Sequence, residues 1–528
     1  MTKIIKHPNS FIIGVILLSI LALAFFLRFY NILSIPVFAD EAIYIRWAQV
    51  MRAEATLRFL PLSDGKQPLF MWLVIPLFKV VSDPLIAGRL VSILSGLAGI
   101  AGTYLLAGRL LNNYRIALVA SLFYAVSPFF VFFDRMALVD SMLASLGVWS
   151  LYFAVLTVQT LRLDFAMITG FFLGAAFITK SPSLFFLLLL PSTILVSNWI
   201  KNRKDIKVLG HIMVLWAVSA VIAFAVLNIL RLGPNFHMIA LRNKDYVFGL
   251  NEVLIHPLDP FQFHIKELLD WFLRLMPYSI FATSVLGIVT GWRKYKLEVL
   301  LLCLWILGPL FVQSEIAKVF TARYILYTIF PFFVLSAVFF ERISVMLKGK
   351  YLIVMAILIS VPALWTDNLL INKPEDSPLP KNERSGYLEA WTSGTGIREV
   401  ADFIKQEHEK NPGWTIVVGT EGFFGTLPDG LQIYTTKVPN VLVKGVGISI
   451  STVDESLIGA KKAKDKVYLV VNSSRLSEKP ENMGIKLIAA YPKAIKADGT
   501  RESLLLFEVQ DEAIKIFDIK NAKNPERS

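Results

Sequence analysis

Long apolar runs separated by short polar loops fill the first 370 residues of the chain. A run of roughly 20 residues forms an α-helix long enough to cross the ~30 Å hydrocarbon core of a bilayer. The pattern therefore predicts an α-helical polytopic membrane protein with about eleven transmembrane helices. The runs lie at about 11–31, 84–108, 116–133, 141–158, 165–181, 183–199, 208–230, 271–291, 297–313, 321–340 and 350–366.

The pattern changes after Asn372 to that of a water-exposed α/β domain. We expect strands near 415–420, 441–446 and 467–472, helices near 396–410 and 453–464, and a hairpin that joins 485–491 to 503–509 through the turn dipeptide Asp498-Gly499. The predicted organisation is a membrane domain at 1–370, with outer loops at 34–83 and 231–270, followed by a small extracytoplasmic domain at 371–528.

Composition agrees with a membrane protein. Of the 528 residues, 55% are hydrophobic and 18% are charged, and the mean hydropathy is +0.59, which is too apolar for a soluble chain. The net charge of +13 comes from basic residues in short loops, and no basic run is interleaved with aromatic residues, so nucleic acid is not an expected partner. The single cysteine, Cys303, rules out an intrachain disulfide and a cysteine zinc site.

Basic residues collect in alternate loops, on the same side as Lys3 and Lys6. The positive-inside rule places these loops and the N-terminus in the cytoplasm of a cell whose plasma membrane the chain crosses several times. The first apolar run is interpreted as an uncleaved span, because no small-residue cleavage site follows it. The loop residues are Arg109, Arg115, Arg162, Lys201, Arg203, Lys204, Lys207, Arg293, Lys294, Lys296, Arg342, Lys348 and Lys350.

In this orientation the remaining ionisable residues fall on the outer face. Asp40 and Glu41 follow the first span, and Asp140 lies at the outer mouth between the third and fourth spans. Ionisable residues beside a membrane are candidates for function. A general base requires a carboxylate, and a leaving phosphate requires fixed positive charge. The candidate cations are Lys66, Arg135, Lys180, Arg242 and Arg323.

Structural roles explain several of these residues equally well. Asp40 and Glu41 are suited to capping a helix, and Asp134, Arg135 and Asp140 to forming an interfacial ion cluster. Lys66 and Lys180 are suited to extending toward lipid headgroups. The dispersed histidines of loop 231–270 do not have metal-ligand spacing. The segment Ser393-Gly394-Thr395-Gly396 is glycine-rich, but no strand precedes it and no lysine follows, which argues against a phosphate loop.

An ordered series of short motifs resembles the integral-membrane glycosyltransferases of the GT-C type. The nearest group is the dolichyl-phosphate-mannose–protein mannosyltransferase superfamily, including its lipid A aminoarabinose-transferase-like members. The motifs are spread over residues 1–340 in the family's order: Asp40-Glu41 with Tyr44, Lys66-Gln67-Pro68-Leu69-Phe70, Gly88-Arg89-Leu90, Arg135 with Asp140 and Ser141, Lys180-Ser181-Pro182, and Arg323-Tyr324 with Pro331. The lysine motif departs from the family at Gln67, where relatives often have a second proline.

The resemblance implies a GT-C fold, a polyprenyl-phosphate-linked monosaccharide donor, and transfer with inversion on the extracytoplasmic face. By the same resemblance, Asp40 is the base or the carboxylate that orients the acceptor, with Glu41 beside it, and Asp140 matches the second acidic position. Lys66 matches the donor-phosphate contact, and Arg242 and Arg323 are further candidates for it. Tyr44, Arg135, Lys180 and Tyr324 would line the substrate pocket. No cofactor is clearly required, and a divalent metal cation at Asp40 and Glu41 stays open.

The sequence thus predicts a hexosyl- or pentosyltransferase whose acceptor is a protein hydroxyl, as in protein O-glycosylation, or a glycolipid, as in lipid A modification. Its partners would be the lipid-linked donor, the acceptor and membrane lipids. One alternative is an oligosaccharyltransferase or glycan ligase. The outer domain has no Trp-Trp-Asp-type motif, which argues against this alternative. A second is a transporter of lipid-linked sugar, which predicts ionisable residues at mid-membrane depth and repeat symmetry.

Overall fold

A computed structural model describes residues 10–201, 205–347 and 349–523 of the chain. Lys3, Lys6, Arg203, Lys204 and Lys348, which contributed to the predicted orientation, lie outside these ranges. The described chain forms two compact units that are each discontinuous in sequence. The first comprises the described residues within 1–32, 54–73 and 89–380, and the second comprises those within 33–53, 74–88 and 381–528. The predicted outer loop 34–83 is therefore divided between them.

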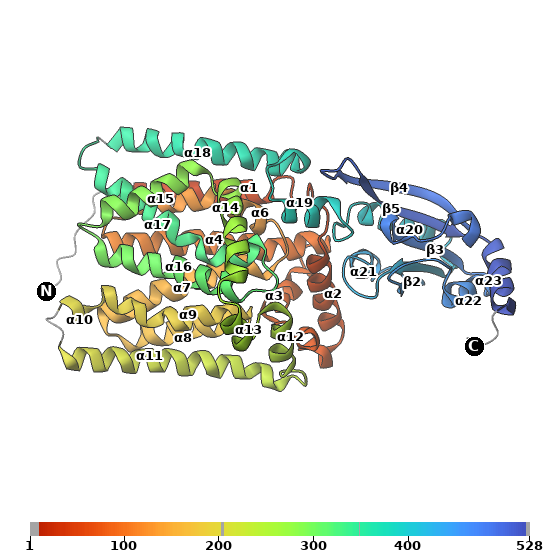
Figure 1. Cartoon of the computed structure of the whole chain (residues 1–528), viewed down its shortest axis with the longest axis horizontal. Helices are drawn as coiled ribbons and strands as arrows, with labels where there is room; N and C mark the ends of the chain where they lie inside the picture. The colour runs from red at the N-terminus through yellow and green to blue at the C-terminus, as the bar shows by residue number, and fades with distance from the viewer. Residues whose placement is uncertain (1–9, 202–204, 348, 524–528) are drawn as a thin grey trace. The chain divides into compact units, whose positions relative to one another are not determined.

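The first unit is a bundle of apolar helices (Figure 1). Seven helical segments of the described chain are long and apolar enough to cross a membrane, and up to ten if each bent pair is one span. The predicted fifth span is the shorter helix α8, with 15 residues. Helices of this unit are α1 (Ser10–Phe29), α4 (Pro84–Leu111), which begins in the second unit, α5 (Tyr114–Ala125), α6 (Pro128–Asp134), α7 (Val139–Thr160), α8 (Leu163–Phe177), α9 (Leu184–Leu189), α10 (Asn198–Lys201), α11 (Ile206–Leu227), α12 (Met238–Tyr246), α13 (Leu250–Ile255), α14 (Asp259–Leu275), α15 (Tyr278–Gly291), α16 (Lys296–Ile316), α17 (Phe330–Ile343) and α18 (Gly349–Asn372).

Proline marks the three bends. The angles are 58° between α5 and α6, 113° between α14 and α15, and 46° between the 3₁₀-helix η6 (Ala322–Thr328) and α17. Pro128, Pro277 and Pro331 lie at these junctions, where a missing N–H and a fixed φ interrupt the helical hydrogen bonds. Each bend creates a free helix end at which polar side chains can be placed.

Glycines let neighbouring helices approach closely. A Cβ at Gly170 of α8 would lie 2.7 Å from Ile222 Cβ, and one at Gly174 would lie 2.5 Å from Val226 Cβ, both in α11. A Cβ at Gly287 of α15 would lie 1.9 Å from the carbonyl oxygen of Leu335 in α17. Small residues at such crossings are typical of helix packing in membranes, and they hold α8 and α15 against their partners (Figure 1).

The second unit contains a five-stranded sheet with the order β2-β1-β3-β5-β4. The strands are β1 (Ile416–Glu421), β2 (Val441–Gly447), β3 (Lys466–Asn472), β4 (Ile485–Ile495) and β5 (Arg501–Val509). β1 pairs in parallel with β2 and β3, and β5 pairs antiparallel with β3 and β4. All five predicted strands are found, and the hairpin turns at Gly499, whose φ is +80°.

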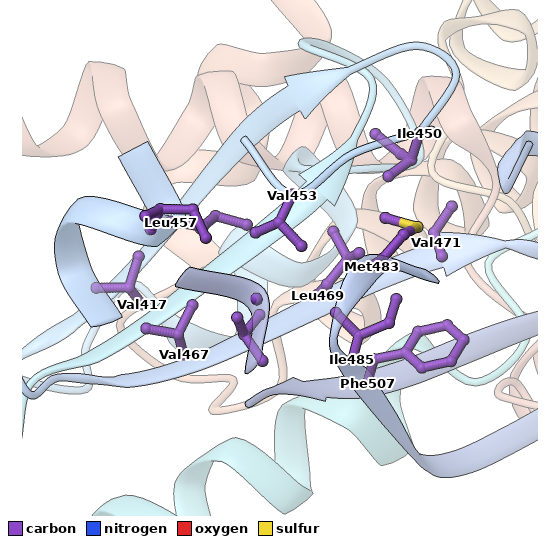
Figure 2. Packing of buried hydrophobic residues seen from close by; sticks show 13 residues of the cluster. Val417, Ile450, Val453, Leu457, Val467, Leu469, Val471, Met483, Ile485 and Phe507 are labelled. Atoms are coloured by element: carbon purple, nitrogen blue, oxygen red, sulfur yellow. The ribbon is translucent and has the colours of Figure 1, made fainter. Parts of the chain in front are cut away.

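Helices cover both faces of this sheet, which explains the nearly continuous apolar sequence of β3. Val467, Leu469 and Val471 pack into a core with Leu457 and Phe507 (Figure 2). On the other face, the ring of Tyr468 lies 5.4 Å from that of Phe403. The helices of the unit are α2 (Ala39–Ala53), α3 (Leu69–Leu77), which begins in the first unit, α19 (Lys381–Arg384), α20 (Ile397–Lys410), α21 (Asp429–Thr435), α22 (Glu455–Lys462) and α23 (Glu512–Lys523).

Candidate active site

Lys66 is presented by a tight turn. The 3₁₀-helix η2 (Leu60–Asp64) ends at Gly65, whose φ of +67° is in the left-handed region that glycine favours. A Cβ at Gly65 would also lie 2.7 Å from both Cβ of Arg242 and the carbonyl oxygen of Met238. Gly65 is therefore required twice, once for the turn and once for the close approach of α12.

This approach brings two predicted phosphate-binding cations together. An oxygen of Asp64 lies 3.6 Å from Lys66 Nζ, and its other oxygen lies 2.7 Å from a guanidinium nitrogen of Arg242. Arg242 also pairs with Asp245 at 2.7 Å. The Asp64 carboxylate raises the pKa of Arg242 above its usual value. Sequence reasoning missed Asp64, although the turn dipeptide Asp64-Gly65 directly before Lys66 was the available signal.

A second ion pair joins two other predicted site residues. Asp140, in the first turn of α7, is 2% exposed, and its Oδ1 lies 2.6 Å from the ammonium of Lys180. The ammonium also lies 4.0 Å from the ring centroid of Tyr324, within cation–π range. Lys180 lies three residues after the end of α8, and Tyr324 lies near the start of η6, so three separate helix ends meet at this pair.

The segments that carry Lys66 and Lys180 lie side by side. Gln67 Nε2 donates to Ser181 Oγ at 2.9 Å, and the Leu69 N–H donates to the Ile178 carbonyl at 3.1 Å. Beneath them Leu62, Ile178 and Leu230 form a buried apolar cluster. The departure from the family motif at Gln67 thus supplies a hydrogen bond between the two lysine segments.

Arg323 and Arg135 have different surroundings. The guanidinium of Arg323 lies 5.3 Å from the ring centroid of Tyr324, which places it beside the Asp140–Lys180 pair. Arg135 is almost fully buried and donates to the backbone carbonyls of Leu27, Arg28, Tyr30 and Asn31 at 2.7–3.1 Å. These four bonds tie Arg135 to the last turn of α1 and to the two residues after it, and its place in the substrate pocket stays a prediction.

Asp40, Glu41 and Tyr44 occupy the first turns of α2, in the second unit. Glu41 is fully buried, and its Oε2 accepts from the Phe38 N–H at 3.0 Å, which closes the start of the helix in the manner of a capping box. Asp40 is half-buried, and the Tyr44 ring packs at 6.1 Å from that of Trp47. The two adjacent carboxylates therefore differ in their contacts. The sequence was compatible with a capping role for either residue, and the structure shows that role for Glu41.

Among the residues that the structure describes, no acidic, histidine or cysteine side chains form a metal-binding cluster. Within residues 10–201, 205–347 and 349–523, no three or more His, Cys, Asp or Glu side chains gather as metal ligands. One carboxylate oxygen of Glu41 also accepts a hydrogen bond from the Phe38 N–H. The donor set therefore does not fit a resident divalent cation at Asp40 and Glu41.

In charge terms, the first unit gathers four cations on adjoining segments: Lys66, Arg242, Lys180 and Arg323. Asp64, Asp140 and Asp245 neutralise part of this positive charge and hold the side chains of Lys66, Lys180 and Arg242 in place. Arginine and lysine arranged in this way are typical phosphate ligands, because both donate charge-assisted hydrogen bonds. Partial exposure of Lys66, Lys180, Arg242 and Arg323 leaves this cationic group accessible to a ligand.

Comparison with known proteins bears on the family resemblance and on the fold. Residues 65–224 match the family described as dolichyl-phosphate-mannose-protein mannosyltransferase. The match includes Lys66, Asp140 and Lys180. No protein with curated annotation matches the sequence.

Two solved structures share the fold along nearly the whole chain. ArnT from Cupriavidus metallidurans bound to undecaprenyl phosphate has 16% identity and a TM-score of 0.57, covering 96% of this chain and 99% of its own. The same protein in the apo state has 17% identity and a TM-score of 0.55, covering 93% and 97%. The predicted resemblance to the GT-C mannosyltransferase-like superfamily and the predicted fold class are confirmed. The chain is a multi-pass membrane protein that shares the fold of ArnT.

Proposed function

We propose that this protein transfers a monosaccharide from a polyprenyl-phosphate donor to an extracytoplasmic acceptor, either a protein hydroxyl or a glycolipid. The observation that carries the proposal is the meeting of Lys66 and Arg242 at Asp64, with the segment of Lys66 hydrogen-bonded to that of Lys180. The fold shared with ArnT, a protein seen with undecaprenyl phosphate, supports a lipid phosphate as the anion. The orientation inferred from the basic loops supports a plasma-membrane enzyme that acts on the outer face.

In the proposed reaction, an acceptor hydroxyl oxygen attacks the anomeric carbon of the sugar from the face opposite the phosphate. The new carbon–oxygen bond forms as the bond from the anomeric carbon to the phosphate oxygen breaks, so the configuration inverts. Asp40 takes the hydroxyl proton as general base. The polyprenyl phosphate leaves with both electrons of the broken bond, and no step requires a metal.

The proposed role of the cations is to stabilise the phosphate that leaves the sugar. Negative charge grows on the phosphate as its bond to the sugar breaks, so Lys66, Arg242 and Arg323 would stabilise the transition state more than the ground state. The Asp140–Lys180 pair would position Lys180 and Tyr324 beside the donor. Glu41 would act through the helix start that it caps.

The test is turnover of synthetic polyprenyl-phosphate hexoses and pentoses by the purified protein in detergent, with membrane extract as the source of acceptor. Release of free lipid phosphate is measured for wild type, Asp40→Asn and Lys66→Ala. We expect release by wild type and loss of it in both variants, with expression and folding intact. Full activity in Asp40→Asn would remove Asp40 as the base, and no release from any monosaccharide donor would contradict the proposed donor class.

A further inference from the structure

The helix that carries Asp40 is packed on the C-terminal α/β domain. Gln49 Nε2 donates to the carbonyl of Ile433 at 2.9 Å, and Arg46 donates to Thr436 Oγ1 at 2.9 Å. In the middle of α2, the Trp47 ring lies 5.7 Å from the ring of Phe424. The body of α2 is therefore fixed on α21 and the loop before it.

The N-terminal end of α2 is held by a short backbone pairing with the segment that the sequence shows as Ser393-Gly394-Thr395-Gly396. The Gly394 N–H donates to the Val37 carbonyl at 2.8 Å, and the Ala39 N–H donates to the Thr392 carbonyl at 3.1 Å. Phe38 and Ser393 form an antiparallel bridge. Asp40 follows directly, so this pairing sets where its backbone lies.

Gly394 is needed for that pairing. A Cβ on Gly394 would lie 2.5 Å from the carbonyl oxygen of Val37, which is the atom its own N–H binds, and 2.4 Å from Val37 Cγ1. The glycine-rich segment thus has a task that a phosphate loop does not explain: it permits close approach of two backbones.

A buried lysine on the sheet donates hydrogen bonds to the same loop. Lys493, in β4, is 1% exposed, and its ammonium donates to the carbonyls of Ala390 at 3.0 Å and Ser393 at 2.7 Å. Burial lowers the pKa of Lys493 to about 8, while nearby Glu502 and Glu421 oppose that change. An ammonium is expensive to bury, so its two bonds to the loop are the feature that needs explaining.

We propose that Lys493 is a positioning residue that orients Asp40 through the loop Ala390–Thr395. This inference rests on the proposed function, and it assigns the C-terminal domain a role in the reaction: the domain carries and aligns the acidic helix. Lys493 itself touches no reacting atom. Its loss would loosen the pairing of 37–39 with 392–394 and leave the phosphate-binding cations of the other unit unchanged.

The test compares Lys493→Met and Gly394→Ala with matched controls in the full-length protein. Lys486→Met removes an exposed lysine from the same strand, and Gly413→Ala adds a Cβ with nothing within 4 Å. Two readouts are taken: hydrogen exchange of peptides covering 36–45, and kcat and KM for the polyprenyl-phosphate sugar per folded molecule.

We expect exchange in 36–45 to speed up at least about tenfold in Lys493→Met and Gly394→Ala, and kcat to fall by a similar factor with KM within about twofold. Lys486→Met and Gly413→Ala should match wild type in the exchange of 36–45, in kcat and in KM. Unchanged exchange, or unchanged kcat per folded molecule in an active background, would overturn the proposal. If wild type releases no lipid phosphate, the proposed function fails, and exchange alone then decides whether Lys493 positions α2.

Discussion

Asp140 and Lys180 form a 2.6 Å ion pair in which the side chain of Asp140 is buried and that of Lys180 is 21% exposed. Removing one partner of such a pair leaves the other charge poorly solvated, which costs more than the pair itself contributes. We expect Asp140→Asn and Lys180→Met each to lower the free energy of unfolding by about 1–3 kcal/mol. The double variant should lose less than the sum.

A double-mutant cycle in detergent, followed by denaturant titration, measures this coupling. The surface pair Arg162–Asp164 is a matched control, because its nitrogen–oxygen distance is 2.5 Å but both side chains are at least half exposed. Solvent screens that pair, so its coupling should lie within experimental error of zero. Additive losses for Asp140 and Lys180 would show that the two do not act as a unit.

Lys66 and Arg242 should contribute unequally to lipid-phosphate binding. A charge-assisted hydrogen bond is worth about 1.5–3 kcal/mol when it is protected from water. Lys66 is 22% exposed and Arg242 is 40% exposed, so we expect Lys66→Ala to weaken undecaprenyl-phosphate binding about 10- to 100-fold and Arg242→Ala about three- to tenfold. Isothermal titration in detergent measures both.

Lys244→Ala is the control for that experiment, because Lys244 is an exposed lysine on the same helix, α12. The affinity of the Lys244→Ala variant for undecaprenyl phosphate should stay within about twofold of wild type. If Lys244→Ala weakens binding as much as Lys66→Ala, the phosphate is attracted by general surface charge, and the pairing of Lys66 and Arg242 at Asp64 is not the site.

We expect Asp64 to compete with an incoming phosphate for Lys66 and Arg242, because it pairs with both cations. Asp64→Asn keeps an oxygen that can accept a hydrogen bond and removes the negative charge that neutralises Lys66 and Arg242. We expect affinity for the lipid phosphate to rise severalfold at low salt, with a smaller rise at high salt because ions screen partly exposed charges. Weaker binding in Asp64→Asn would instead mean that the carboxylate is needed to position the cations.

Much of the fold follows from local sequence, because period and turn chemistry act over short distances. The strand at Thr415–Thr420 and the hairpin through Asp498-Gly499 are found within a residue or two at most bounds, since burial on both faces and a positive φ leave little choice. What sequence did not indicate is that 33–53 and 74–88 group with the C-terminal domain. That grouping depends on long-range contacts such as Arg46 with Thr436, which no local pattern encodes.

The sequence indicated which residues come together better than it indicated what each side chain contacts. Lys66 with Arg242, and Asp140 with Lys180, are brought together across long stretches of sequence. Arg135 looked equivalent from its position at a helix end, yet it binds four backbone carbonyls. A guanidinium that donates to backbone carbonyls and one that pairs with carboxylates, as Arg242 does, have the same sequence signature.

The two adjacent carboxylates of α2 should separate by phenotype. Glu41→Ala removes the acceptor of the Phe38 N–H, so we expect a loss of about 1 kcal/mol or more in unfolding free energy and a partial loss of turnover. Glu41→Gln keeps an oxygen for that bond and should recover most of the stability. Asp40→Asn should leave stability within about 0.5 kcal/mol and abolish turnover.

Thermal unfolding and lipid-phosphate release, measured on the same preparations, make this comparison. A stable but inactive Glu41→Gln variant would point to chemistry at Glu41 beyond its cap. An Asp40→Asn variant that is both unstable and inactive would make Asp40 a structural residue, and its assignment as the base would fall.

Lys493 should make stability depend on alkaline pH. Its folded-state pKa of about 8 lies below the ordinary lysine value of 10.5 because the ammonium is buried. Between these two values the unfolded chain binds more protons than the folded protein, so the free energy of unfolding rises with pH over that window. The gain is at most about 3 kcal/mol, and it is lost as pH falls back through about 8.

The measurement is the difference in unfolding temperature between wild type and Lys493→Met at pH 7.5, 8.5 and 9.5. Methionine does not titrate, so wild type should gain stability relative to the variant as pH rises. Glu421, Glu502 and Lys496 face the same ammonium and remain in both proteins, so their titration largely cancels in the comparison. Lys486→Met, which removes an exposed lysine from β4, should show no such trend. A flat difference for Lys493→Met would mean that its ammonium reaches water and does not hold the loop at Ala390 and Ser393 as a buried charge.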